Sequence, residues 1–434
     1  MHQMKTIICQ FSKKPFVRNV VIMTSGTAAA QLIAVAASPI ITRLYGPEVY
    51  GMMGVFQSTA QIIVPIAALT YPVAIVLPKS DQDAKGIMRL SIYISIALSV
   101  LSLLLLLIFN KPIVELFNIE EIAPYTFLFP LVILFSGLMQ VNEQWLIRTK
   151  QFRITAKTMF YRSLFINGGR VGIGFYYPVA AVLISLTAVE NGFRALMMRL
   201  HIRKSTYKLN DSDYNKSPLK SLAKKYKNFP IYRSPHVFIS ALSQNMPVLL
   251  LTFFFGPASA GFFAIGRTVL NVPSQLIGKS IGDVFYPRIS EAINKKEHIT
   301  KPIIKATVAL FIVGIIPYGI IMAFGPSIFS LVFGSDWSTA GEYARWMAFW
   351  VFCMFLNRPS TKALPAMFAQ AFQLKYATFT LVIRFLAFVT GYYFFSDDLI
   401  ALAFFSIVAG LLSLGLIMLT LLISKKFDME NVKG

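Results

Sequence analysis

The sequence predicts an all-α membrane protein that crosses the bilayer many times. Hydrophobic residues make up 56% of the 434 residues and charged residues only 14%, whereas soluble domains have roughly 45–50% and about 25%. Long windows therefore hold nothing polar enough to face water, and the run SIYISIALSVLSLLLLLIF at 91–109 is close to the ~20 residues of a membrane-spanning helix. A third observation is a repeat: ITRLYGPEVYGMMGVF at 41–56 has a relative, LTFFFGPASAGFFAIG, at 251–266.

The repeat predicts two similar halves. A shift of 210 positions superposes four pairs of identical residues: Thr42 and Thr252, Gly46 and Gly256, Pro47 and Pro257, Gly51 and Gly261. In each copy a Gly-Pro bend lies between two apolar runs, so we expect the same helix–turn–helix corner twice. Six predicted spans separate the copies, and an even number leaves both halves in the same orientation. We therefore expect two parallel-repeat six-helix lobes around a central cavity.

Apolar windows between polar breaks predict twelve transmembrane helices. They lie near residues 19–42, 51–77, 88–109, 124–146, 155–176, 178–198, 234–255, 260–286, 303–325, 340–357, 376–395 and 400–424. The first is too long for the apolar core of a signal peptide, so we expect it to be a permanent span. The expected domains are an N-terminal lobe (1–200), a basic cytoplasmic linker with an interfacial helix near 217–228 (201–233), and a C-terminal lobe (234–434).

The distribution of Lys and Arg predicts the orientation. The odd-numbered connections carry only two cations, Arg43 and Lys111, beside seven acids, whereas the termini and even-numbered connections carry the other loop cations. Basic segments stay on the cytoplasmic side, so both termini are expected there. The net charge of +22 is therefore mostly a signal of topology. A nucleic-acid-binding protein would gather such charge on one surface, so we expect no nucleic-acid partner.

No pattern in the sequence favours covalent chemistry. The two cysteines, Cys9 and Cys353, lack partners at the spacing of a disulfide or metal site. We find no nucleophile–base pair, no cluster of metal ligands and no Gly-rich phosphate loop, so we expect a transporter without a metal or cofactor. A membrane polymerase or glycosyltransferase is disfavoured as well, because the odd-numbered connections are too short for a catalytic domain.

Charged residues inside the predicted spans are the candidates for function, because a charge at the membrane centre costs at least ~2.5–3.5 kcal/mol. The central set contains five cations and two acids: Arg170, Arg194, Arg267, Lys279, Arg384, Glu190 and Asp283. The excess of cations predicts an anionic ligand, since guanidinium matches phosphate and carboxylate oxygens. Five more charged residues lie near span ends, where side chains can reach the interface: Arg162, Lys305, Arg345, Glu143 and Glu342.

Two smaller patterns accompany this set. Glu190 and Arg194 stand one helical turn apart and are expected to pair, either as a structural or as a functional ion pair. Arg148 and Arg358 correspond under the shift of 210 positions. Both lie near the cytoplasmic face, where gating and a plain positive-inside anchor are equally good interpretations.

The eighth predicted span carries a polar stripe. Its members recur every four residues, which keeps them on one side of a helix: Arg267, Asn271, Gln275, Lys279 and Asp283. Such a stripe cannot face lipid, so it lines either a hydrated cavity or a dry network between helices. The shift of 210 positions maps Arg267 onto Gln57 and Asn271 onto Gln61. Both lobes are thus expected to aim polar groups inward from the equivalent helix.

The opening run FVRNVVIMTSGTAAAQLIAVAASPIITRLYGPEVYG (16–51) has an Arg, a Gly-Pro pair and a Tyr-Gly pair. Together with NRPSTKALPAMFAQ (357–370) and SDDLIALAFFS (396–406), it resembles oligosaccharide flippases of the Wzx type. These belong to the multidrug/oligosaccharidyl-lipid/polysaccharide exporter superfamily, and the resemblance covers essentially the whole chain. It implies a bacterial inner-membrane protein that moves undecaprenyl-diphosphate-linked oligosaccharide repeat units from the cytoplasmic to the periplasmic leaflet, for O-antigen, capsule or exopolysaccharide.

The resemblance also implies roles for residues. The five central cations would attract the diphosphate, and a polar set would hydrogen-bond sugar hydroxyls: Gln31, Gln57, Gln61, Asn271 and Gln275. Prolines in spans two and eight would allow bending: Pro65, Pro72 and Pro273. Independently of the resemblance, the embedded acids Glu190 and Asp283 are candidates for coupling transport to an ion. A polysaccharide polymerase and a chain-length regulator are the implied protein partners. Two alternatives stay open, a multidrug exporter and a flippase for the peptidoglycan lipid precursor.

Overall fold

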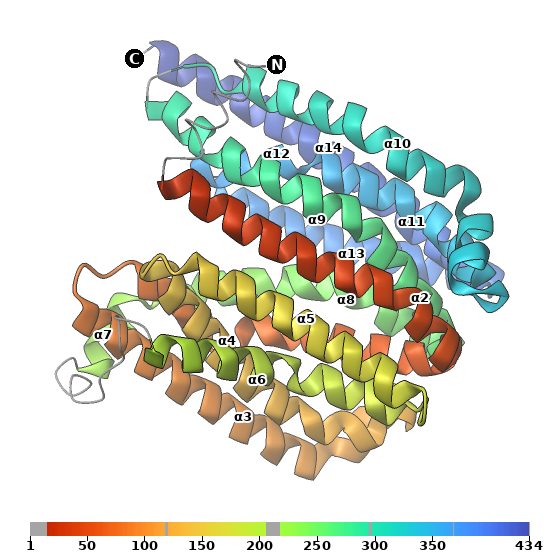
Figure 1. Ribbon diagram of the computed structural model, residues 1–434. Helices are drawn as coiled ribbons and strands as arrows, with labels where there is room; N and C mark the ends of the chain where they lie inside the picture. The colour runs from red at the N-terminus through yellow and green to blue at the C-terminus, as the bar shows by residue number, and fades with distance from the viewer. Residues whose placement is uncertain (1–14, 118–119, 205–217, 295–296, 368, 434) are drawn as a thin grey trace, which may run out of the picture. The chain divides into compact units, whose positions relative to one another are not determined.

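The computed structural model describes residues 15–117, 120–204, 218–294, 297–367 and 369–433 (Figure 1). Within these residues every regular element is helical, as predicted, and each predicted span overlaps a helical element. In chain order the elements are α2 (Pro15–Ile63), η1 (Val64–Ile66), η2 (Tyr71–Val76), α3 (Asp81–Phe117), η3 (Glu120–Leu128), α4 (Phe129–Arg148), α5 (Phe152–Gly174), α6 (Ala180–Lys204), α7 (Leu219–Lys225), η5 (Phe229–Arg233), α8 (Ser234–Phe255), α9 (Pro257–Asn294), α10 (Thr300–Phe333), η6 (Ser335–Trp337), α11 (Ser338–Leu356), α12 (Arg358–Ala366), α13 (Gln370–Phe395) and α14 (Asp398–Lys433).

The helices have the length and composition of a multi-pass membrane protein. Among the described residues, eight segments are long and apolar enough to cross a bilayer, and the first of them, Ser25–Ile66, overlaps both of the first two predicted spans. The helices α5, α9 and α11, on which predicted spans five, eight and ten fall, are not among these eight. The count of twelve spans therefore stays a prediction.

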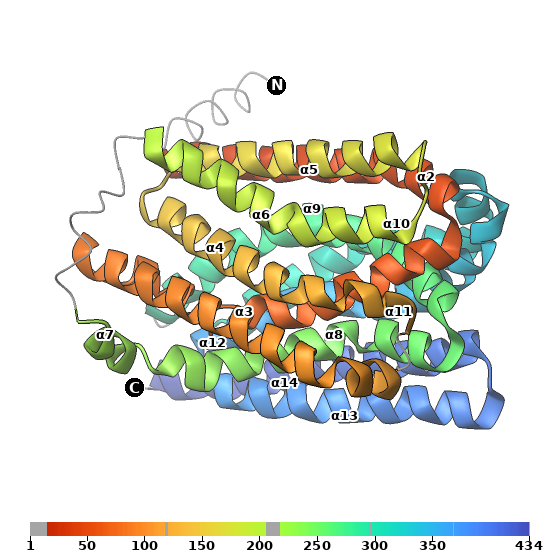
Figure 2. The ribbon, with the colours of Figure 1, turned by 90° about the horizontal axis from the view of Figure 1, so that it is seen from below.

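The chain divides into two compact units, namely Met1–Tyr45 with Val55–Ala241, and Gly46–Gly54 with Leu242–Gly434. In the first unit α4 packs against α3 and α6, and α6 packs against α5. In the second unit α11 packs against α10 and α14, and α14 packs against α13. Figures 1 and 2 show these neighbours within each unit. Each unit thus contains the same order of packed helices, which is the structural counterpart of the sequence repeat.

The linker helix α7 packs onto the first unit. It lies where the sequence predicts a helix, and its Leu222 is buried in a core cluster with Met198 and Ile202 of α6. The hydroxyl of Tyr71 donates to the carbonyl of Ala223 at 3.2 Å. This segment therefore extends the core of the first unit at one end of its helices.

The Gly-Pro corners have the geometry that the repeat predicts. Gly46 interrupts α2 with a φ of 68°, and Gly256, its equivalent, has a φ of 87°. Side chains disfavour this left-handed region, whereas glycine enters it freely. No atom lies within 4 Å of a β-carbon built on either residue. Glycine is therefore needed at these two positions for its backbone conformation.

The second glycine of each corner is needed for a close approach. In the second unit, the segment Gly46–Gly54 packs against the start of α9. A β-carbon on Gly51 would collide with the carbonyl of Pro257, and one on Gly261 would collide with the carbonyl of Pro47. The contact is reciprocal, since each of the two glycines faces the proline carbonyl of the other corner. Both glycines are therefore needed for this close approach within the second unit.

The helix after the first corner is broken. The α-helix ends at Ile63, and the chain continues through the 3₁₀-helices η1 and η2, which contain Pro65 and Pro72. Between them Leu69 and Thr70 have φ values of 48° and 55°, which are uncommon for residues with side chains. Two of the three expected proline bends are therefore present here, whereas Pro273 lies inside α9.

Candidate functional site

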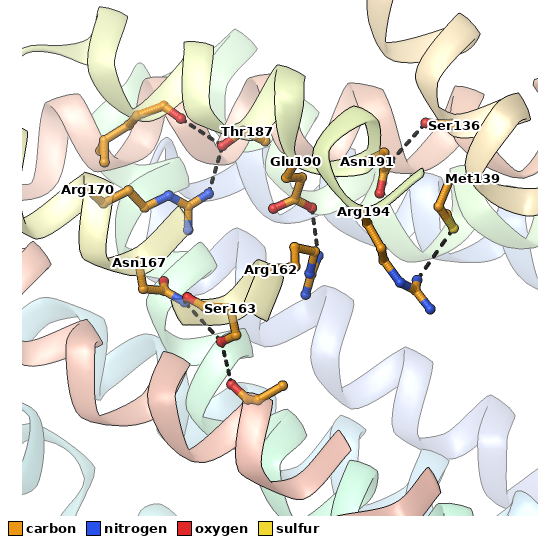
Figure 3. Close-up of polar contacts among 12 residues, drawn as sticks. Ser136, Met139, Arg162, Ser163, Asn167, Arg170, Thr187, Glu190, Asn191 and Arg194 are labelled. Carbon is orange, nitrogen blue, oxygen red and sulfur yellow. Dashed lines mark hydrogen bonds and ion pairs between the residues drawn. The ribbon is translucent and has the colours of Figure 1, made fainter. Parts of the chain in front are cut away.

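The first unit holds a band of polar contacts between α5 and α6 (Figure 3). Arg170, on α5, donates from its guanidinium to the hydroxyl of Thr187, on α6, at 2.8 Å. The carbonyl of Arg170 accepts a hydrogen bond from the hydroxyl of Tyr45 at 2.8 Å. One turn earlier on α5, Asn167 donates to Ser163. These contacts hold Arg170 at a defined place between the two helices.

Two ion pairs in this unit differ from the expected one. Glu190 accepts from Arg162 of α5 at 3.1 Å, and Arg194 donates to Glu143 of α4 at 2.7 Å. The expected pairing of Glu190 with Arg194 on one helix is therefore wrong. The reason is that α6 packs between α4 and α5, so Glu190 and Arg194 each have a partner on a neighbouring helix. Arg162 and Glu143, which we expected to reach the interface, are those partners.

The ion pair with Glu143 neutralises the charge of Arg194, whose side chain is only 9% exposed, and this favours a structural role for Arg194. We expect Glu143→Gln to destabilise the protein by about 3 kcal/mol, since removing one partner leaves a buried charge uncompensated. The double variant Glu143→Leu/Arg194→Met should recover most of this loss. The thermal unfolding midpoint in detergent measures both.

The matched control is Glu342→Gln, which breaks the pair Arg345–Glu342, with side chains 43% and 38% exposed. Exposed pairs contribute up to ~1 kcal/mol, so this change should shift the midpoint little. A stable Glu143→Gln protein that has lost transport would instead assign Arg194 and Glu143 to the transport machinery.

The second unit holds two arginines of a different kind. Arg267, on α9, donates to the side-chain oxygen of Asn245 at 2.9 Å, and Arg384, on α13, donates to the hydroxyl of Ser243 at 3.2 Å. Both acceptors are neutral and lie on α8. Within the described part of the chain neither arginine has a carboxylate partner, and the buried Nε of Arg384 has no hydrogen-bond partner. A guanidinium has five N–H donors, so both side chains retain donors for an anion.

The polar residues expected to meet sugar hydroxyls are placed as follows. Gln31, Gln57 and Asn271 are half-buried, whereas Gln61 and Gln275 are exposed. No side-chain hydrogen bond is recorded for these five among the residues that the structure describes. The structure describes the side chains of the polar stripe of α9 only from Arg267 to Gln275. The side chains of Lys279 and Asp283 lie outside the described residues.

Arg148, at the end of α4, is an anchor. Its guanidinium donates to the carbonyls of Ile75 and Pro78 at 3.1 and 2.7 Å, and to the carboxylate of Asp81 at 2.8 Å. These bonds fix the connection between η2 and α3. The positive-inside interpretation of Arg148 is therefore favoured over gating.

Sequence reasoning did not identify the partners of these arginines. Ser243 and Asn245 lie in SALSQNMP, a polar interruption of the seventh span, and that interruption was the available signal. It also did not identify Asp398, at the start of α14. The carboxylate of Asp398 accepts hydrogen bonds from the hydroxyls of Ser259 on α9 and Tyr343 on α11 and so joins the three helices. Over the described residues, no group of three or more His, Cys, Asp and Glu is arranged to hold a metal ion.

Comparison with known proteins adds the family. A family model described as polysaccharide biosynthesis protein matches residues 40–342. The chain belongs to this family. The succinoglycan biosynthesis transport protein ExoT of Rhizobium meliloti (strain 1021) is 21% identical to this polysaccharide biosynthesis protein over 337 residues. That match covers 75% of the chain but 64% of ExoT, which is less than two thirds of its length.

Two solved structures have the same fold. An inward-facing multidrug resistance transporter of the MATE family, in the MOP superfamily, has a TM-score of 0.73 at 14% identity and covers 93% of this chain and 96% of its own. The lipid II flippase MurJ, in an inward closed conformation, has a TM-score of 0.72 at 12% identity, with 95% and 91% covered. The chain is thus a member of a polysaccharide biosynthesis family, and its fold is that of these two membrane transporters.

Proposed function

We propose that the protein moves undecaprenyl-diphosphate-linked oligosaccharide repeat units from the cytoplasmic to the periplasmic leaflet of a bacterial inner membrane. Family membership and the likeness to ExoT support a role in polysaccharide export. The observation that carries the substrate class is the state of Arg267 and Arg384, which contact neutral acceptors on α8 and keep donors available. Both termini lie in the cytoplasm in this proposal, as the basic loops indicate.

The physical argument concerns the charge of these two arginines. Cations inside a membrane protein usually face the bundle interior or a water-filled space, and they mark the path of a ligand. A diphosphate supplies several anionic oxygens, and the planar guanidinium binds such oxygens with two parallel hydrogen bonds. Outward movement of negative charge across an inside-negative membrane gains ~2.3 kcal/mol per charge per 100 mV. The membrane potential therefore favours export of the diphosphate.

The remaining predicted residues complete the proposed path. Arg170 and Lys279 add positive charge near the diphosphate, while the five polar residues of α2 and α9 hydrogen-bond sugar hydroxyls. The two repeats alternate between cytoplasmic and periplasmic openings, and the polyprenyl chain stays in lipid. Asp283 is the candidate for ion coupling, because Glu190 is engaged by Arg162. A polymerase and a chain-length regulator act on the delivered units.

Two alternatives within the superfamily differ in substrate. A multidrug exporter of cations requires acidic residues at the centre of the membrane. Arg267 and Arg384 instead place positive charge beside neutral acceptors, which disfavours a cationic substrate. A flippase for the peptidoglycan lipid precursor handles the same diphosphate, so the arginines do not separate it from the proposed function. Only the sugar part of the substrate distinguishes the two flippases.

Reconstitution separates these alternatives. The full chain is placed in proteoliposomes with a fluorescent undecaprenyl-diphosphate oligosaccharide in both leaflets, and a membrane-impermeant quencher reports translocation. We expect rapid exchange of this substrate and slow exchange of the peptidoglycan precursor, with no transport of cationic dyes. Exchange of the peptidoglycan precursor alone, or accumulation of dyes, would assign the protein to the corresponding alternative.

A further inference from the structure

The first unit contains a groove of about 400 Å³ between α2 and α5, and the transport path proposed above does not use it. Gly26 of α2 and Ala156 of α5 lie in direct contact, since a β-carbon built on Gly26 would be 2.5 Å from that of Ala156. Figures 1 and 2 show these two helices next to each other. Ser25 and Ala29 lie one residue before and three residues after Gly26. Both are also small, and both line the groove.

Two cations border the groove. Arg153 and Lys157 lie one helical turn apart on α5, and Tyr161 follows after one more turn on the same side. All three side chains are exposed. Within the described ranges of the chain no ion pair is recorded for Arg153 or Lys157. The cationic edge is thus free to meet an anion, and the ring of Phe160 supplies an apolar wall.

The predicted spans place the α5 side of the groove near the level of lipid headgroups. Arg153 is the second residue of α5, and Arg153 and Lys157 flank the start of the predicted fifth span at residue 155. This end of the helix carries one of the basic connections that predict the cytoplasmic side. An amphiphile can place its phosphate at the two cations and its chains along the apolar wall. A volume of about 400 Å³ suits a headgroup, being in the lower part of the ~300–1,000 Å³ range of ligand sites.

We propose that this groove binds the phosphate headgroup of an anionic phospholipid from the cytoplasmic leaflet. Basic pockets between membrane helices on the cytoplasmic side are suited to such headgroups, and each Lys or Arg near the surface contributes to the attraction. Arg153 offers a fork to phosphate oxygens, and Lys157 adds a compact point charge. The bound lipid fixes α2, near Gly26, against the start of α5. The site is separate from Arg267 and Arg384, which belong to the second unit.

Native mass spectrometry of the full chain tests this proposal, with phosphatidylglycerol as the probe and phosphatidylcholine as the neutral reference. We expect Arg153→Gln/Lys157→Gln to weaken retention of phosphatidylglycerol about 10- to 30-fold, because two cations are removed. The matched control is Lys301→Gln/Lys305→Gln, which removes two exposed cations at the same spacing at the start of α10. It should retain the lipid like the unmodified protein.

A second variant tests the groove by its shape. Ala29→Leu fills the groove without changing a charge, so it should also weaken phosphatidylglycerol retention while the unfolding midpoint stays unchanged. Retention at the unmodified level in both groove variants would overturn the proposal, and so would equal loss in the α10 control. A preference for undecaprenyl diphosphate over phosphatidylglycerol would instead make the groove part of the substrate path. The proposed role of Arg267 and Arg384 in transport does not depend on these outcomes.

Discussion

Gly51→Val and Gly261→Val are each expected to destabilise the protein by about 3 kcal/mol, the upper part of the usual range for overpacking. The reason is that the atoms in the way are the backbone carbonyls of Pro257 and Pro47, which cannot rotate aside like a side chain. Separating the two corners would disturb the packing of Gly46–Gly54 within the second unit. The unfolding midpoint and the monodisperse yield in detergent measure the effect.

The control for these variants is Gly319→Val, a change of the same kind in α10, where no atom lies within 4 Å of the added β-carbon. It should not destabilise the protein, because the added β-carbon meets no atom and valine has a somewhat higher helix propensity than glycine. Equal losses in all three variants would contradict the reciprocal contact. At Gly46, Asn should be tolerated better than Val, because φ is 68° and asparagine enters the left-handed region more readily than β-branched residues.

Arg384→Ala and Arg267→Ala are each expected to slow transport about 10- to 100-fold while leaving the unfolding midpoint nearly unchanged. A hydrogen bond to a charged group contributes ~1.5–3 kcal/mol, and each 1.36 kcal/mol is about tenfold in rate. Stability should hold because Ser243 and Asn245 are neutral, so no buried charge is left uncompensated. Lysine at either position should restore only part of the rate, since it retains the charge but lacks the planar fork.

The control is Arg345→Ala, which removes an exposed cation that donates to Glu342 and to the carbonyl of Met322. It should transport normally. If Arg384→Ala and Arg267→Ala exported lipid-linked oligosaccharide at the unmodified rate, these arginines would be structural. Rates for proteoliposomes with the fluorescent substrate provide the comparison.

The sequence predicted the helices and their repeat because both depend on local patterns. Apolar windows located α3, α4, α10 and α14, and the paired glycines located the corners at Gly46 and Gly256. The polar interval of α9 from Arg267 to Gln275 was visible because four-residue spacing keeps side chains on one face. In each case the signal lies within one element or in its repeat.

Contacts between helices were harder to predict, because periodicity shows which face is polar but not what packs against it. Glu190 and Arg194 looked like a pair along one helix, yet α6 lies between α4 and α5 and each residue bonds across. The partners of Arg267 and Arg384 on α8 were missed for the same reason. The left-handed residues Leu69 and Thr70 carry no local signal, since neither residue type favours that region.

Cysteine accessibility in intact membranes tests the central claim, that Arg267 and Arg384 border a hydrated path for an anionic substrate. Arg267→Cys and Arg384→Cys are made in a protein whose Cys9 and Cys353 are replaced by alanine, with Leu386→Cys as a lipid-facing control at a 51% exposed apolar position. We predict that a charged, water-soluble thiol reagent labels the first two positions and not the third, and that undecaprenyl-diphosphate-linked oligosaccharide protects them. Unreactive thiols at both arginine positions, in protein that folds normally, would contradict the account.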